Sequence, residues 1–154
     1  MSLVDRTLTM TVLTGSGLLA GVLFAVALSV VPALAAMTPD RYVVTHQLLG
    51  RRYDRVMPLI NLASFGSAVT LAARSDDGAR TALLAGVAVA LAGVALVSQL
   101  GNVPINRRVK RTDPARVDDS WADPRRRWRG WNLLRTTFAV TACVLAAAAV
   151  VTPW

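Results

Sequence analysis

The sequence contains few of the residue types on which most enzyme chemistry depends. Its 154 residues include one histidine and one cysteine, and none is glutamate. A single cysteine, Cys143, excludes an intramolecular disulfide and any metal site built from several cysteines. A single histidine, His46, excludes zinc sites that need two or more imidazoles. We therefore predict no bound metal, because these residues and the scattered methionines form no convincing ligand set for metal-dependent redox chemistry.

Charged residues are also scarce, and most carry one sign. They form 17% of the chain, whereas about a quarter is usual for a globular domain. Hydrophobic residues form 54%, and the mean hydropathy is +0.47. This composition excludes a disordered chain, which needs low hydrophobicity. The net charge of +8 fits a nucleic-acid binder, but the excess of apolar residues argues against one, and we predict no nucleic-acid partner.

The apolar residues are gathered in four long runs. Residues 8–36, 56–73 and 81–106 carry no charge, and residues 133–154 carry only Arg135. About 20 helical residues cross a hydrocarbon core about 30 Å thick. We therefore predict an all-α fold, an integral membrane four-helix bundle with up-down topology. A soluble bundle is the alternative, but residues 83–100 lack the polar face that a soluble helix shows.

We predict one membrane domain, residues 1–154. Its expected spans are about 8–36, 56–73, 81–106 and 132–152. We expect the first span to be retained, because its apolar run is longer than a signal-peptide core.

The helix-start signals Thr38-Pro39 and Asp123-Pro124 predict helical extensions before the second and fourth spans. It remains open whether residues 38–49 continue the second helix or lie in the interface. Gly17 and Gly21 form a GxxxG pair, which favours close packing of membrane helices.

The basic residues predict an orientation. Thirteen of the 17 lie in the two expected loops, 37–55 and 107–131, and three lie on the other side of the membrane. The positive-inside rule places these loops in the cytoplasm and both termini outside the cytoplasmic membrane. The arginines would also face anionic membrane lipids. The sequence leaves an oligomer open.

Polar residues near the expected cytoplasmic ends form stripes at helical spacing. The stripes are Gln99, Asn102 and Asn106; Trp128, Trp131, Asn132 and Arg135; and Tyr42, His46, Leu49 and Tyr53, with Gln47 adjacent and Asn61 deeper. Each has a structural alternative: the asparagines cap a helix end, the tryptophans anchor at the interface, Arg135 extends to headgroups, and His46 is structural. Together they predict a polar cavity that opens to the cytoplasmic leaflet.

The motifs in these stripes resemble those of the anthrone oxygenase-like family, a group of small four-helix membrane proteins. The resemblance rests on N-x-P-x-N at residues 102–106 and on W-N-x-x-R-T at residues 131–136, with Trp121 and Trp128 before it. The first half is similar to the family at residues 21–24, 31–34, 46–47 and 57–58.

The resemblance implies oxidation of a small hydrophobic aromatic substrate, an anthrone, to a quinone by O₂, with no cofactor. It implies His46, Asn102, Asn132 and Arg135 as catalytic residues. Gln47, Asn61, Gln99, Asn106, Trp128 and Trp131 would bind the substrate. In a straight helix, however, His46 would lie about 18 Å above Pro58, unless the chain bends near Gly50. The alternative is a non-enzymatic accessory subunit that binds a lipid or small hydrophobic molecule.

Overall fold

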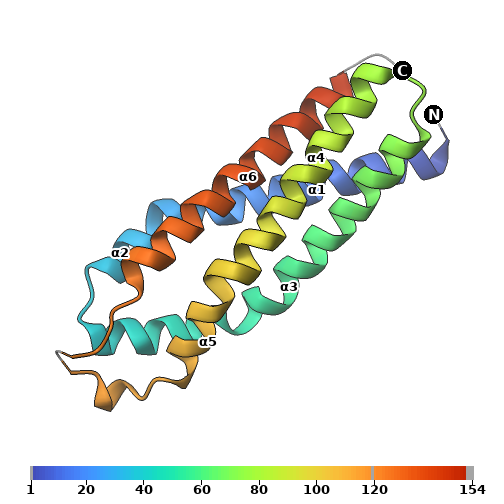
Figure 1. Cartoon of the computed structure of the whole chain (residues 1–154). Helices are drawn as coiled ribbons and strands as arrows, with labels where there is room; N and C mark the ends of the chain where they lie inside the picture. Colours follow the sequence, from blue (N-terminus) through green and yellow to red (C-terminus); the bar gives the residue numbers. More distant parts are fainter. Residues whose placement is uncertain (1, 119, 152–154) are drawn as a thin grey trace.

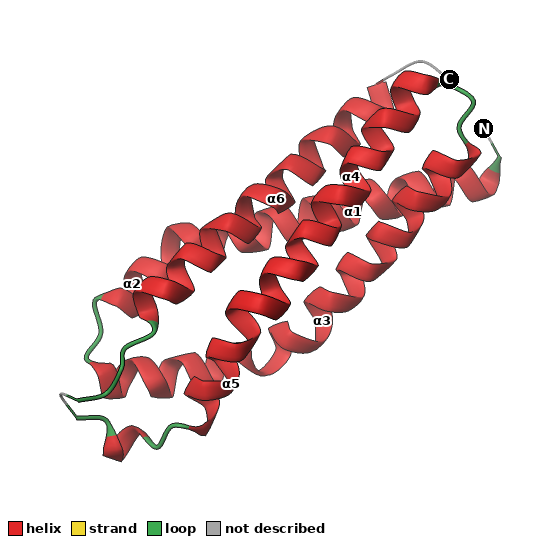
Figure 2. Cartoon of the chain, viewed as in Figure 1, coloured by secondary structure: helices red, strands yellow, loops and turns green. Residues whose placement is uncertain are grey.

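The computed structural model describes residues 2–118 and 120–151, and every regular element within them is helical (Figure 2). The elements in chain order are α1 (Leu3–Ala25), η1 (Val26–Val30), α2 (Val31–Ala35), α3 (Pro39–Arg74), α4 (Gly78–Val97), η2 (Ser98–Asn102), α5 (Val103–Arg111), η3 (Pro114–Arg116) and α6 (Arg125–Val151). Helices α1 and α2 are continuous through η1, and α4 and α5 are continuous through η2. The chain therefore forms four long helical rods, and the predicted all-helical fold is confirmed.

The four rods pack side by side with alternating direction. Helix α1 contacts α3 and α6, and α4 contacts the same two helices, so each rod has two neighbours (Figure 1). The start of α1, the end of α6 and the connection at residues 75–77 lie at one end, which we call the terminal end. The connections at residues 36–38 and 112–124 lie at the other end, which we call the loop end.

The outer surfaces of the rods are suited to lipid. Four segments are long and apolar enough to cross a membrane: Leu3–Ala35, Tyr53–Arg74, Gly78–Arg111 and Arg125–Val151. Large apolar side chains on them, such as Leu59 at 68% and Val89 at 70%, are exposed. A water-soluble surface rarely carries so many such residues together. The fold is therefore that of an integral membrane bundle. The predicted end of the fourth span, residue 152, lies outside the described residues.

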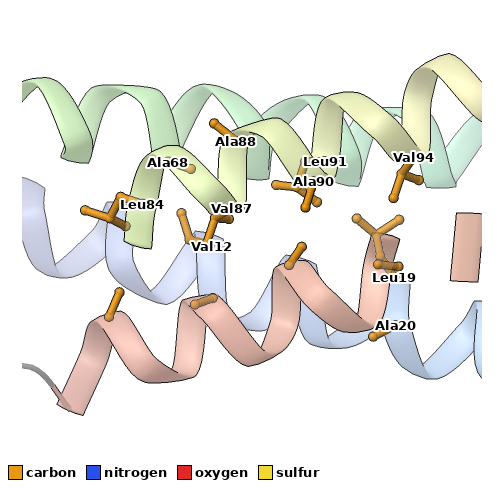
Figure 3. Packing of buried hydrophobic residues seen from close by; sticks show 14 of the residues in the cluster. Val12, Leu19, Ala20, Ala68, Leu84, Val87, Ala88, Ala90, Leu91 and Val94 are labelled. Carbon is orange, nitrogen blue, oxygen red and sulfur yellow. The ribbon is translucent and has the colours of Figure 1, made fainter. Parts of the chain in front are cut away.

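Small and branched apolar residues fill the space between the rods. In Figure 3, Val12 and Leu19 of α1 lie opposite Leu84, Val87 and Leu91 of α4. Close contact occurs at glycines, but not at the GxxxG pair. A β-carbon at position 17 or 21 would meet nothing within 4 Å, whereas one at Gly93 would lie 2.8 Å from the ring of Phe138. Close approach between rods thus occurs at Gly15 of α1, which faces Ser64 of α3, and at Gly93, between α4 and α6, rather than at Gly17 and Gly21 of α1.

Helix α3 shows whether residues 38–49 continue the second helix or lie in the interface. They continue the second helix from Pro39, with Thr38 as the N-cap. The helix bends, however, so that its first part lies across the loop end and its second part runs along the bundle (Figure 1). Pro58 lies inside the helix, where its ring crowds the carbonyl of Asp54 and removes one hydrogen bond. The extension before the second span therefore closes one end of the bundle.

Two rods contain a π-helical turn next to a proline. The turn η1 directly precedes Val31-Pro32, and η2 directly precedes Val103-Pro104. Proline cannot donate to the carbonyl four residues earlier and clashes with it. A wider turn relieves that crowding, and such turns are frequent at functional sites. The second of them ends at Asn102, one of the predicted site residues.

Candidate functional site

The loop end holds a second buried cluster, separate from the main core. It brings together α2, the first part of α3, α5 and the start of α6, with Tyr42, Val43, Ile105, Val109 and Trp128 among its buried members. Tyr42 and Val43 are fully buried, and His46 is 4% exposed. The bend of α3 lays its first part against α5, so the sole histidine of the chain is enclosed at the loop end.

His46 is held by side chains from two other helices. Its Nε2 lies 3.1 Å from Oδ1 of Asn106 on α5. The indole Nε1 of Trp128 on α6 donates to the same oxygen at 3.0 Å. The imidazole also meets two aromatic rings edge-on, those of Tyr42 and Trp128, each at 5.3 Å between centroids. Three of the predicted site residues thus form one connected group.

The surroundings of His46 favour its neutral form. Burial lowers the pKa of the imidazole below its ordinary value of 6.5, and Lys110 lowers it further. The hydrogen bond to Asn106 and the carboxylate of Asp54 act in the opposite direction, but burial prevails. Lys110 and Asp54 form an ion pair at 2.5 Å, so their charges largely cancel as seen from His46. His46 is therefore an uncharged imidazole at neutral pH.

The turn η2 and helix α6 place further buried polar groups beside this cluster. Asn102 is fully buried, and its Nδ2 donates to the backbone carbonyl of Trp128 at 3.3 Å. One turn further along α6, Asn132 is fully buried, and Thr136 bonds to its carbonyl oxygen at 2.7 Å. Arg135 lies on the same side of α6 and is partly buried. Asn132 and Arg135 belong to the stripe predicted on the fourth span, and Asn102 belongs to the one predicted on the third.

Several of these polar groups have no hydrogen-bond partner among the described residues. They are Oδ1 of Asn102, both amide atoms of Asn132, Nε of Arg135 and the hydroxyl of Tyr42. Buried polar groups in native proteins are almost always paired, and each exception calls for an explanation. Nδ2 of Asn132 and Nε of Arg135 are donors, whereas Oδ1 of Asn102 and Oδ1 of Asn132 are acceptors, so the set suits a ligand that presents both a carbonyl oxygen and a hydroxyl group. The arrangement is thus chemically prepared for a polar group within an otherwise apolar bundle.

The indole ring of Trp131, which belongs to α6, packs against the π-helical turn η2. A β-carbon at Gly101 would lie 2.3 Å from Cδ2 of Trp131, so the ring rests where a side chain at position 101 would otherwise be. The absence of a side chain at Gly101 allows this contact. Trp131 therefore has a defined place between α6 and η2, next to Asn102.

The remaining predicted site residues do not join the His46 group. Gln47 donates to the carbonyls of Val109 and Thr112, where it caps the end of α5. Asn61 donates to the carbonyl of Leu91 at 3.2 Å, and its Oδ1 has no partner within the described residues. Gln99 is exposed on η2. It was expected on the face of Asn102, but a π-helical turn holds more residues than an α-turn, so residues three apart diverge.

One residue of the site had no distinguishing signal in the sequence. Arg125 is one of three consecutive arginines, yet its Nη1 bonds to the carbonyls of Leu34, Ala35 and Met37, at 2.6–3.3 Å. It also pairs with Asp123 and lies 5.4 Å from the ring centre of Tyr42. Burial alone would raise the pKa of the Asp123 carboxyl, but the hydrogen bonds from Arg125 hold it below its ordinary value. Arg125 thus ties the end of α2 to the start of α6.

Elsewhere in residues 2–118 and 120–151, we identify no second candidate centre of comparable character. Among the described residues, no group of three or more His, Cys, Asp or Glu side chains lies close enough together to hold a metal ion. A small hollow at the terminal end has a mainly apolar lining with one charged side chain, Arg80. None of the predicted site residues lines it.

The fold and the site together define a helical membrane protein with a buried, partly unpaired polar cluster at one end. A comparison with protein-family models then places the chain. The anthrone oxygenase model matches residues 46–145, which is most of the chain, and the protein belongs to this family. The match begins at His46 and includes every predicted site residue. Searches of curated proteins and of solved structures found no match.

Proposed function

We propose that this protein oxidises a hydrophobic aromatic compound of the anthrone type to a quinone with O₂ and without a cofactor. The observation that carries the proposal is the set of unpaired, buried polar atoms of Asn102, Asn132 and Arg135, with Asn102 bonded to the backbone of Trp128, whose indole shares Asn106 with a neutral imidazole. The family membership supports the same chemistry. The substrate, O₂ and membrane lipids are the partners that this proposal implies.

The substrate supplies the electrons for this reaction. An anthrone carries a CH₂ group between two aromatic rings and opposite a carbonyl, so loss of one proton gives a delocalised, electron-rich anion. That anion reduces O₂ and combines with it to give a peroxide at the same carbon. Loss of the second hydrogen of the CH₂ as a proton then breaks the O–O bond and leaves a new carbonyl. One oxygen atom is retained in the quinone, and the other leaves as water.

In this proposal His46 accepts the first proton, because a neutral imidazole is a suitable base near neutral pH. Nδ2 of Asn132 and Nε of Arg135 donate to the substrate carbonyl and stabilise the negative charge that develops on oxygen, and Oδ1 of Asn102 accepts a hydrogen bond from a phenolic hydroxyl of the substrate. Trp131 offers a flat indole on which the aromatic rings stack. Trp128 and Asn106 contact His46 instead, so they act on the substrate through it. Because the substrate is apolar, it enters from the bilayer.

The proposal also has an orientation. Thirteen basic residues lie in loops 37–55 and 107–131, at the loop end. We propose that this end faces the cytoplasm, that both termini lie outside, and that the membrane is the cytoplasmic membrane. The site then lies near the inner leaflet, where a substrate made in the cytoplasm arrives.

The test is oxidation of anthrone by the purified protein in lipid nanodiscs. Quinone absorbance and O₂ consumption are measured against empty nanodiscs, both with and without a metal chelator. We expect at least about 100-fold acceleration over autoxidation, the size of contribution that a positioned base alone makes. Asn132→Leu should abolish it, and Gln99→Ala, at an exposed position of η2, should not.

Equal rates with and without protein would overturn the enzymatic proposal. If the protein nevertheless binds anthrone, measured by quenching of tryptophan fluorescence, the alternative of a non-enzymatic binding subunit is favoured. Loss of activity in the presence of the chelator would show that the reaction needs a metal.

A further inference from the structure

The contacts around His46 fix the orientation of a side-chain amide. An indole N–H is only a donor, so the atom of Asn106 that meets Nε1 of Trp128 must be an acceptor. That atom is Oδ1. If the amide were rotated by half a turn, its NH₂ group would face another donor. Trp128 thereby determines which way the Asn106 amide points.

The same oxygen determines where the imidazole carries its proton. Oδ1 of Asn106 lies 3.1 Å from Nε2 of His46, and an amide oxygen only accepts hydrogen bonds. Nε2 must therefore carry a hydrogen and donate it. In a neutral imidazole the other nitrogen, Nδ1, then holds a lone pair. Within the described part of the chain, no hydrogen bond from protein reaches Nδ1.

The ring itself is held from two sides. Tyr42 meets it at an interplanar angle of 65°, and Trp128 meets it at 70°. A half-turn of the imidazole would place Cε1 where Nε2 lies, and it would break the bond to Asn106. The aromatic neighbours thus fix the plane of the ring, and Asn106 fixes which edge of it carries Nε2.

We propose that Trp128 and Asn106 are positioning residues, which hold His46 in the Nε2–H tautomer so that Nδ1 is the atom that accepts the substrate proton. This inference rests on the proposed function and changes the role of Asn106 and Trp128 from substrate binding to alignment of the base. When Nδ1 takes the proton from the CH₂ group, the imidazolium keeps its bond from Nε2 to Asn106. His46 then returns that proton to the oxygen that leaves as water.

The charges near His46 are compatible with this role. Asp54 on α3 favours the imidazolium, and Lys110 on α5 opposes it. Arg125 of α6 faces Tyr42, and burial raises the pKa of the Tyr42 phenol, so Tyr42 stays neutral. The imidazole is thus neutral before the reaction, the state in which its tautomer matters.

The chain offers a direct test because His46 is its only histidine. The protein is produced with ¹⁵N-labelled histidine and a purification tag that contains none, and its ¹⁵N spectrum is recorded in nanodiscs at pH 8. We expect Nε2 at the shift of a protonated nitrogen and Nδ1 at that of an unprotonated one. The reverse assignment, or an average of the two forms, overturns the inference.

Variants separate alignment from simple packing. Trp128→Phe keeps a large ring but removes the donor, so the amide is free to rotate; we expect averaged tautomer signals and kcat about 10- to 100-fold lower, with KM changed little. Trp121→Phe is the matched control, because the rings of Trp121 and Tyr42 pack in the same cluster with 6.1 Å between their centroids. This variant should keep the native signals. Asn106→Asp keeps an acceptor and should keep the tautomer while raising the pKa of His46.

The outcomes of the two proposals are distinguishable because the spectrum requires no turnover. Native tautomer signals in Trp128→Phe overturn the inference, whatever the oxidation assay shows. Altered signals with unchanged kcat overturn the choice of Nδ1 as proton acceptor. A wild-type protein that shows the Nε2–H tautomer but oxidises no anthrone overturns the proposed function and leaves the alignment of His46 supported.

Discussion

The indole of Trp131 packs directly against Gly101 and occupies the space that a side chain there would need. A β-carbon added at Gly101 would lie 2.3 Å from Cδ2 of the ring. This contact joins α6 to η2 beside Asn102. The position of the ring therefore depends on the absence of a side chain at Gly101. The first prediction tests this dependence.

Gly101→Ala should displace Trp131. An alanine normally favours a helix over glycine by about 1 kcal/mol, but overpacking costs about 1–3 kcal/mol. We expect a lower midpoint of thermal unfolding and a shifted tryptophan emission. Gly17→Ala is the control, since nothing lies within 4 Å of its β-carbon, and it should be neutral or stabilising. A native emission spectrum and midpoint for Gly101→Ala would contradict the contact.

Asn132→Leu should separate stability from function. Asn132 is fully buried, and neither of its amide atoms is paired within the described structure. Leaving such a group unpaired costs about 1–3 kcal/mol, so a leucine of similar size should stabilise the protein or leave it unchanged. Anthrone oxidation should fall by about 100-fold or more, since a donor to the developing oxyanion is lost. Destabilisation with full activity would show that Asn132 is structural.

Oxidation should depend on pH through His46. Its pKa lies below 6.5 because of burial, so the rate should be constant at neutral pH and fall only in more acidic solution. An inflection above pH 6.5 would contradict this assignment.

The free energy of unfolding should also decrease in acidic solution. As the pH falls below 6.5, the unfolded chain binds a proton at His46 before the folded chain does. The free energy of unfolding therefore decreases until the lower, folded-state pKa is reached, and the contribution is fully present above pH 6.5. His46→Gln should lack this step in unfolding experiments in detergent.

Arg125→Gln should loosen the loop end. The guanidinium bonds to three backbone carbonyls at the end of the first rod and to Asp123. Hydrogen bonds from charged groups contribute about 1.5–3 kcal/mol each, and several are lost together. We expect faster proteolysis at residues 112–124 and a lower unfolding midpoint. Arg126→Gln, at the exposed neighbouring position, should change neither.

The orientation is testable with single cysteines. After Cys143→Ala, a cysteine is placed at exposed Asp76 of the terminal end or at exposed Ala115 of the loop end. A membrane-impermeant maleimide applied to intact cells should label position 76 and spare position 115 until the cells are lysed. The opposite pattern would reverse the proposed topology.

The sequence predicts the helical membrane fold and most of the polar cluster, because long apolar runs and regular spacing are local signals. His46 marks the limit of such reasoning. In a straight helix it would lie far from the other site residues, and only the bend of α3 brings it to Asn106 on α5. A bend depends on what the helix packs against, which Pro58 alone does not reveal.

Two further differences have the same origin. Gln99 and Asn102 do not share a face, because both belong to a π-helical turn. Close contacts occur at Gly93 and Gly101 and not at Gly17 and Gly21. Arg125 was indistinguishable from its neighbours until the end of α2 was placed beside it. Spacing along one helix therefore predicts faces, but not which partner each face meets.

The π-helical turn η2 also changes the direction in which the side chains of α5 point relative to those of α4. It holds about one residue more than an α-turn, which sets the faces of α4 and α5 about 100° out of phase. Asn106 therefore meets His46 of α3, whereas a regular α-helix without the extra residue of η2 would turn the Asn106 side chain about 100° away from it.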